Sequence, residues 1–271
     1  ITYSENLNGA GWNFYSSSGG IATRTLNYGI SPDGKLNSTR VVFSDANTAL
    51  YFVTSINAEA TASMYVKGVA GETIGFGFGA SVASGSDFVF NGEWQRLEFT
   101  DISINYALSI NTWGGARDAR DFEVWGVQME EQSYATSYIP TNGAIATRLA
   151  DECTGAGNAS TFNDSEGVLY AEISALADDQ TRRHISVSDG TSDNVVRFHY
   201  NDDGSNRIRF QVRSNGSIEV SSSFSIDDIK EFHKVAIFYR LNDVKFFIDG
   251  FEVGTDTSAA MPIGLDVLNF D

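Results

Sequence analysis

Short apolar runs make up most of this chain, and clusters of Gly, Asn, Asp and Ser interrupt them every few residues. Runs of this length are typical of β-strands, and the polar clusters between them are typical of turns. In the first half we expect strands at 40–43, 49–53, 61–67, 73–78, 87–90, 94–99, 106–110 and 121–125. Eight short strands separated by turns indicate a β-sandwich or jelly roll.

The second half repeats the pattern, with expected strands at 167–173, 184–188, 194–200, 207–212, 234–239, 243–250 and 268–271. Asn215-Gly216 follows an alternating run and is a strong hairpin signal. Along 207–213, Arg and Gln alternate with Ile, Phe and Val. This alternation predicts a strand with one face exposed to solvent and the other buried. Residues 227–232 form the one segment for which we expect a short helix. The chain is therefore predicted to be all-β, with two β-sandwich (jelly-roll) domains in tandem.

Between the two halves, residues 124–151 begin as a strand, cross the segment SYATSYIPT at 133–141, and end in a small polar stretch. We interpret this segment as the last strand of one domain and the connector to the next. The expected division is a first domain at 1–141, a linker at 142–160 and a second domain at 161–271. Within the connector, we expect Tyr134 and Tyr138 to anchor it against the first domain.

Charge and cysteine content exclude several classes of protein. The net charge is −17, and it divides into −7 for residues 1–141 and −10 for residues 142–271. With no basic run to offset it, this charge argues against a nucleic-acid partner, and no apolar run is long enough to cross a membrane. Cys153 is the one cysteine, so no intrachain disulfide forms, and its acidic neighbours favour an inert thiol.

The first half resembles jelly-roll carbohydrate-binding modules from about Ser4 to Ile139. The matching residues are MYVKG at 64–68, GETI at 71–74 and EWQR at 93–96. The connector resembles a junction found in bacteriophage tail-fibre and other virion surface proteins. This resemblance implies a virion surface location after assembly in the host cytoplasm, other virion proteins as partners, and a homotrimer.

The second half resembles the laminin G-like/concanavalin A-like family through HKVA at 233–236 and VKFFIDG at 244–250. Domains of that family usually have more strands than fit before Asp271. We therefore expect the second sandwich to be incomplete as given.

No pattern in the sequence indicates catalysis. A nucleophile motif and zinc spacing are both absent, and His184, His199 and His233 lie in three separate segments. Adjacent carboxylates, as at 130–131 and 227–228, are expected in solvated turns and point opposite ways on a strand, which suits a glycosidase poorly. The chain is predicted not to be an enzyme.

Sugar binding needs exposed aromatic rings with polar groups nearby. Trp113 is the first candidate, because it lies in the turn-rich segment 111–115, and Trp12 and Tyr15 in the segment 11–15 come second. The alternative for each is that the ring caps the end of the hydrophobic core. Trp94 and Trp125 lie within expected strands and are predicted to be core residues.

Jelly-roll modules of the resembled type often hold a structural calcium between the first strand and the last. That resemblance places the candidate ligands at Glu5, Asn6 and Asp121. The alternative is that these are ordinary turn and edge residues.

The leading hypothesis is a non-catalytic tail-fibre or head-decoration protein of a tailed phage that adheres to host or environmental glycans. One alternative is an accessory carbohydrate-binding region of a secreted polysaccharide-degrading enzyme. Another is a structural spacer without a ligand.

Overall fold

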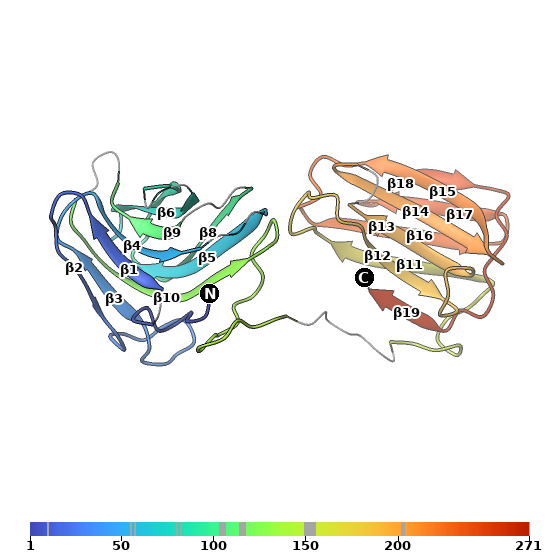
Figure 1. Ribbon diagram of the computed structural model, residues 1–271. Helices are drawn as coiled ribbons and strands as arrows, with labels where there is room; N and C mark the ends of the chain where they lie inside the picture. Colours follow the sequence, from blue (N-terminus) through green and yellow to red (C-terminus); the bar gives the residue numbers. More distant parts are fainter. Residues whose placement is uncertain are drawn as a thin grey trace. The chain divides into compact units, whose positions relative to one another are not determined.

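The chain folds into two compact units, residues 1–148 and 149–271, each with its own hydrophobic core (Figure 1). This computed structural model describes residues 1–9, 11–54, 56, 58–79, 81, 83–102, 107–113, 118–148, 156–201 and 204–270. Both units consist of antiparallel sheets packed face to face, so the predicted all-β fold with two β-sandwiches is confirmed. The described residues contain no helix of the length and apolarity needed to cross a membrane.

Two five-stranded sheets form the first unit. Their orders are β1-β4-β9-β6-β7 and β2-β3-β10-β5-β8. The strands are β1 (Trp12–Ser16), β2 (Ala22–Thr25), β3 (Thr39–Phe43), β4 (Thr48–Val53), β5 (Ala60–Lys67), β6 (Thr73–Gly79), β7 (Ser86–Val89), β8 (Gln95–Asp101), β9 (Ala107–Asn111) and β10 (Arg120–Glu130).

Alternation along each strand supplies the core of the first unit. On β6, Ile74, Phe76 and Phe78 are buried in the core and alternate with Gly75 and Gly77. Successive side chains of a strand point to opposite faces, so one apolar residue in two is enough to fill the sandwich. Burial of each such side chain stabilises the fold by about 1.5–3 kcal/mol.

The start of the connector packs against the first unit through Tyr138. Its ring lies 4.6 Å from that of Trp125, and its hydroxyl donates to Glu5 Oε1 at 3.0 Å and lies 2.7 Å from Ser4 Oγ. Burial raises the pKa of the Tyr138 hydroxyl, so it stays a protonated donor. Beside this ring, Gly126 has φ of 63°, where β10 bulges against β5. The predicted anchoring role is thus confirmed for Tyr138, while Tyr134 is half-buried.

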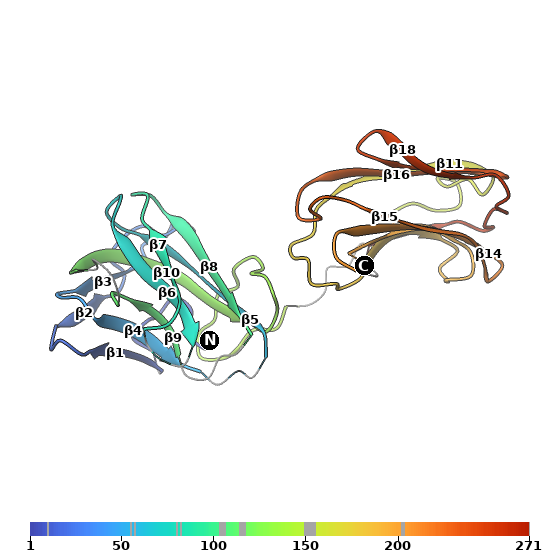
Figure 2. The ribbon, with the colours of Figure 1, turned by 90° about the horizontal axis from the view of Figure 1, so that it is seen from above.

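A four-stranded and a five-stranded sheet form the second unit, and Figure 2 shows them as two layers. Their orders are β11-β16-β17-β18 and β15-β14-β13-β12-β19. The strands are β11 (Glu166–Ile173), β12 (Arg183–Ser188), β13 (Val195–Tyr200), β14 (Arg207–Ser214), β15 (Ser217–Ser225), β16 (His233–Arg240), β17 (Asp243–Ile248), β18 (Phe251–Asp256) and β19 (Val267–Phe270).

Phe210 of β14 lies at the centre of the second core. Its ring stacks on that of Phe246 from the opposite sheet, with centroids 4.8 Å apart and an interplanar angle of 24°. Offset stacking of this kind adds about 0.5–1.5 kcal/mol beyond the area that the rings bury. The same core holds Phe198, Ile237 and Tyr239.

The short helix expected at 227–232 is wrong, because this segment is a turn. Its backbone groups are used by tertiary partners. The Ile229 carbonyl accepts hydrogen bonds from Tyr200 Oη at 2.5 Å and Ala175 N at 2.8 Å, and Ile229 N donates to Asn206 Oδ1 at 2.9 Å. These bonds replace the i to i−4 bonds that a helix requires.

Strands β1, β2 and β18 were not expected from the sequence, and all three lie at the edge of a sheet. An edge strand pairs on one side and buries less, so its pattern is weaker. The alternating exposure of β2 and the largely open β18 show this directly.

Candidate functional site

Tyr15 and Trp113 form a stacked aromatic pair on the outer side of the β1-β4-β9-β6-β7 sheet. Their ring centroids lie 5.6 Å apart, and the rings are inclined by 22°. Tyr15 is 47% exposed and Trp113 is half-buried. Trp12 and Phe14 alternate with Tyr15 on β1 and point inward, so the Tyr15 ring faces outward.

Strand register brings this pair together from distant parts of the chain. Tyr15 lies opposite Ala49 of β4, and Ala49 lies opposite Asn111, the last residue of β9. Because Ala49 is small, the two rings meet across β4. Tyr51 lies two residues along β4, opposite Asn13, and is half-buried on the same side. We call Asn13, Tyr15, Tyr51 and Trp113 the aromatic face.

Hydrogen bonds hold the backbone that carries Trp113. Its N–H donates to Asn111 Oδ1 at 3.1 Å, and the Asn111 amide donates to Ser109 Oγ at 3.2 Å and to the Ser84 carbonyl at 3.3 Å. The neighbouring Thr112 exchanges bonds with Thr48. Asn111 and Thr112 are fully buried. Hydrogen bonds to buried neighbours thus fix the backbone at Trp113, as a binding residue requires.

Two sequence predictions about tryptophan were wrong. Trp12 is 4% exposed and packs in the core with Phe52 at 5.5 Å, so it offers no ring to a ligand. The alternation of β1, which the sequence did not reveal, turns it inward. Trp94 precedes β8, is half-buried, and donates from Nε1 to the Ile30 carbonyl at 3.0 Å. Trp125 is buried as predicted.

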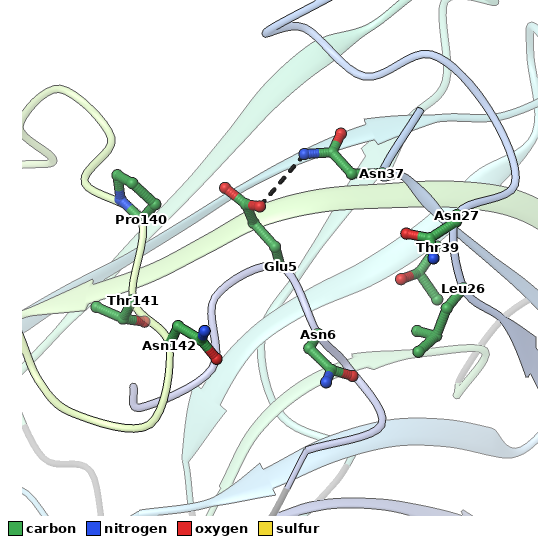
Figure 3. A pocket seen from close by; sticks show the side chains of 9 residues that line it. All are labelled: Glu5, Asn6, Leu26, Asn27, Asn37, Thr39, Pro140, Thr141 and Asn142. Atoms are coloured by element: carbon green, nitrogen blue, oxygen red, sulfur yellow. Dashed lines mark hydrogen bonds between the residues drawn. The ribbon is translucent and has the colours of Figure 1, made fainter. Parts of the chain in front are cut away.

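Glu5 and Asn6, two of the predicted calcium ligands, line one pocket of about 550 Å³. Figure 3 shows Glu5 between the segment 140–142 and Asn37, whose amide donates to Glu5 Oε2 at 3.2 Å. Glu5 Oε1 accepts the Tyr138 hydroxyl, and Asn6 Oδ1 accepts the N–H of Asn8. Calcium requires about 6–8 oxygen ligands, and Glu5 is the one carboxylate in this lining.

Asp121, the third predicted ligand, lines a different hollow with Lys67 and Glu123. Its carboxylate pairs with the Arg40 guanidinium at 2.8 and 2.5 Å, and this hydrogen-bonded pairing lowers the pKa of Asp121. Among the described residues no group of three His, Cys, Asp or Glu side chains could hold a metal ion. Calcium binding therefore stays a prediction, and Asp121 is occupied elsewhere.

The histidines take structural positions. His184 and His199 lie directly opposite each other on β12 and β13, with ring centroids 5.7 Å apart. His233 Nδ1 lies 2.7 Å from Asp249 Oδ2. Burial would lower the pKa of His233, but its hydrogen bonds to Asp249 and the Asp228 carbonyl raise it overall. Cys153 falls outside the described residues.

Sequence reasoning found Trp113 and Tyr15 but missed Tyr51, Asn13 and the supporting Asn111. The available signal was alternation in 49–53, where Leu50 and Phe52 turn inward and leave Tyr51 on the outer side. What the sequence did not supply was the pairing of β1 with β4, which places these residues side by side.

Residues 156–266 match the family model described as the concanavalin A-like lectin/glucanases superfamily. The second unit is similar to that superfamily. No curated protein matches the chain.

Three solved structures show weak likeness. The N-terminal CBM22-1–CBM22-2 tandem domain of Paenibacillus barcinonensis Xyn10C is 14% identical, with a TM-score of 0.33, over 96% of this chain and 90% of that one. Domains LG4-5 of the mouse laminin α1 chain are 8% identical, with a TM-score of 0.26, over 77% and 74%. The tripod from the baseplate of bacteriophage Tuc2009 is 10% identical, with a TM-score of 0.25, over 71% and 82%. Likenesses this weak say nothing about function.

Proposed function

We propose that this protein is a non-catalytic adhesion protein of a tailed-phage virion surface, and that its aromatic face holds glycans. The observation that carries the proposal is the stacked pair of Tyr15 and Trp113 on an outer sheet face. An exposed aromatic pair beside polar side chains is what a sugar ring requires, because the ring packs its C–H groups on an aromatic face and its hydroxyls need hydrogen bonds.

The surroundings favour a neutral sugar. Strands β1, β4, β9, β6 and β7 contain a single charged residue, Asp87. Asn13 and Tyr51, two residues along β1 and β4 from Tyr15 and Ala49, supply polar groups on the same side of the sheet. Hydroxyl and amide groups read sugar hydroxyls without the cost of burying a charge.

The phage assignment rests on the connector's resemblance to junctions in virion surface proteins, and so does a homotrimer. Display on an oligomer multiplies weak contacts, since linked sites bind as if at high local concentration.

Glycan binding by an oligomeric form of the protein tests this proposal, on an array of neutral host polysaccharides. Trp113→Ala is expected to weaken binding about 30-fold, the effect of losing a contact of about 2 kcal/mol, and Tyr15→Ala about 10-fold. Tyr28→Ala is the matched control, because Tyr28 is 48% exposed and Tyr15 is 47% exposed. Equal weakening by Tyr15→Ala and Tyr28→Ala would contradict the aromatic face.

Two alternatives predict different outcomes. A structural spacer binds no array member even as an oligomer. An accessory region of a secreted polysaccharide-degrading enzyme binds, but its parent gene encodes a signal peptide and a catalytic domain instead of lying among tail or capsid genes.

A further inference from the structure

The pocket that contains Glu5 is lined mostly by polar side chains, and its volume is about 550 Å³. Three distant segments of the first unit line it: the loop before β1, the stretch from the end of β2 to the start of β3, and the start of the connector (Figure 3). Four of the lining residues are asparagines, at positions 6, 27, 37 and 142. We call this cavity the asparagine pocket.

A buried hydroxyl without a partner lies in the wall of this pocket. Thr39, the first residue of β3, lines the pocket and is 0% exposed, and Val41 and Phe43 continue the same side of β3 into the core. Thr39 Oγ1 has no hydrogen-bond partner among the described residues. Leaving a buried hydroxyl unbonded destabilises a fold, and valine would have the same shape without this cost. The hydroxyl is therefore a group that a bound ligand would satisfy.

A ligand can reach this hydroxyl because the neighbouring wall is exposed. Thr25 of β2 pairs with Arg40, so Thr39 lies close to the chain that follows β2. Asn27, two residues beyond the end of β2, lines the pocket and is exposed. An exposed side chain changes rotamer freely, so the Asn27 side chain can turn aside and open the way to Thr39.

Two hydrogen bonds fix the carboxylate of Glu5 inside the pocket. Tyr138 Oη donates to Glu5 Oε1 at 3.0 Å, and Asn37 Nδ2 donates to Glu5 Oε2 at 3.2 Å. An ionised carboxylate has about four lone-pair sites, so each oxygen of Glu5 can accept one more hydrogen bond. Glu5 therefore offers two oriented acceptors to a ligand without losing its bonds within the protein.

The other asparagines provide amide groups with unused capacity. Asn6 Oδ1 accepts the N–H of Asn8, which leaves the amide N–H groups of Asn6 as donors. The side chains of Asn27 and Asn142 are exposed and have no hydrogen-bond partner among the described residues. Each amide both donates and accepts, as a sugar hydroxyl does.

We propose that the asparagine pocket binds a neutral monosaccharide unit, such as the terminal residue of a glycan. Its volume lies in the range of small-molecule sites, and Leu26 and Pro140 add apolar wall on which sugar C–H groups pack. An anion would meet Glu5, and no residue in the described lining is Lys or Arg. Calcium would find a single carboxylate.

The proposal goes beyond glycan adhesion through the aromatic face. Tyr15, Tyr51 and Trp113 are absent from the described lining of the pocket, so the two sites share none of these side chains. The aromatic face offers rings to a sugar, whereas the pocket offers a carboxylate, amides and a hydroxyl.

Ligand-observed NMR titration of the full chain with glucose, galactose, mannose and N-acetylglucosamine tests the proposal. We expect at least one of these sugars to bind, and Asn27→Gly to weaken its binding about fivefold. Asn27 has φ of 52°, which glycine adopts without strain, so the change removes the amide alone. The matched control is Asn242→Gly, because Asn242 is an exposed asparagine with φ of 58° in the second unit.

Thr39→Val separates binding from stability. It should weaken sugar binding about fivefold and raise the melting temperature of the first unit, because it removes a hydroxyl that has no partner in the free protein. The matched control is Thr61→Val on β5. Thr61 is 1% exposed, and its hydroxyl lies 2.7 Å from Thr100 Oγ1 and donates to the Gln132 carbonyl at 2.8 Å. This control should lower the melting temperature and leave sugar binding unchanged.

Several results would overturn the proposal: no binding of any of these sugars, equal weakening by Asn27→Gly and Asn242→Gly, or binding of calcium without binding of sugar. Trp113→Ala is measured beside these variants to tell the two sites of the first unit apart. Weakening by Trp113→Ala without weakening by Asn27→Gly would assign the sugar to the aromatic face and exclude the pocket.

Discussion

The β1-β4-β9-β6-β7 sheet of the first unit, which carries the aromatic face, and the β15-β14-β13-β12-β19 sheet of the second unit are both five-stranded, but their strands differ in charge. The first sheet contains one charged residue, Asp87, and presents Tyr15 and Trp113. The second contains five arginines and one glutamate. Inward positions must be apolar in both, whereas outward positions are not constrained by the core. The outward residues of a sheet can therefore change, and with them the ligand that the sheet binds, while the fold stays the same.

The comparison requires that the two units fold on separate cores. Phe210→Ala removes the ring stacked on Phe246 and should destabilise the second unit by about 3–5 kcal/mol. All four tryptophans belong to the first unit, so their fluorescence reports on that unit alone. We expect an unchanged tryptophan transition and an earlier transition by calorimetry. A parallel shift in the tryptophan signal would show that the cores are coupled.

The hairpin between β14 and β15 maintains the register that turns the arginines outward. Asn215 has φ of 49°, so Asn215→Ala places an ordinary side chain in the left-handed region and should cost the second unit about 1 kcal/mol. Asn215→Gly is the control, because glycine adopts this conformation without strain. Chemical denaturation measures both, and an equal loss from the two variants would point to the Asn215 side chain instead.

The smallest expected effect is the absence of cross-talk between the units. Arg209→Gln and Lys245→Gln each change an outward side chain on one sheet of the second unit. Both variants should leave the binding of a neutral polysaccharide and of a free sugar within twofold of wild type, since the changed residues lie in a unit with a separate core. Titration calorimetry of each variant with each ligand measures all four affinities. A larger effect would mean that one ligand spans both units.

Much of the fold was predictable because a strand needs one apolar residue in two. The expected runs at 61–67 and 243–250 appear as β5 (Ala60–Lys67) and β17 (Asp243–Ile248), which differ from them by one or two residues at one end. Prediction failed where burial is partial, as in β2 and β18, and where tertiary hydrogen bonds replaced local ones, as around Ile229.

The candidate site was predictable residue by residue but not as a surface. Trp113 was identified because a tryptophan in a turn-rich loop has little local reason to be buried. Trp12 was misread because a ring in a short edge strand carries no sign of which side it faces. The sequence predicted that the arginines of 207–213 face solvent, but it did not predict which residues of β13 and β15 lie opposite them.

Where alternation is clear, as along 207–213, the sequence by itself determined that a strand forms and which of its side chains point away from the core, because both depend on a period of two along a few residues. Tertiary structure alone decided which strands are neighbours, and so which solvent-facing side chains lie side by side. Tyr15 meets Trp113 because β1, β4 and β9 are adjacent in the sheet although far apart in the chain. Lateral order is set by the packing of a whole core, and no local pattern encodes it.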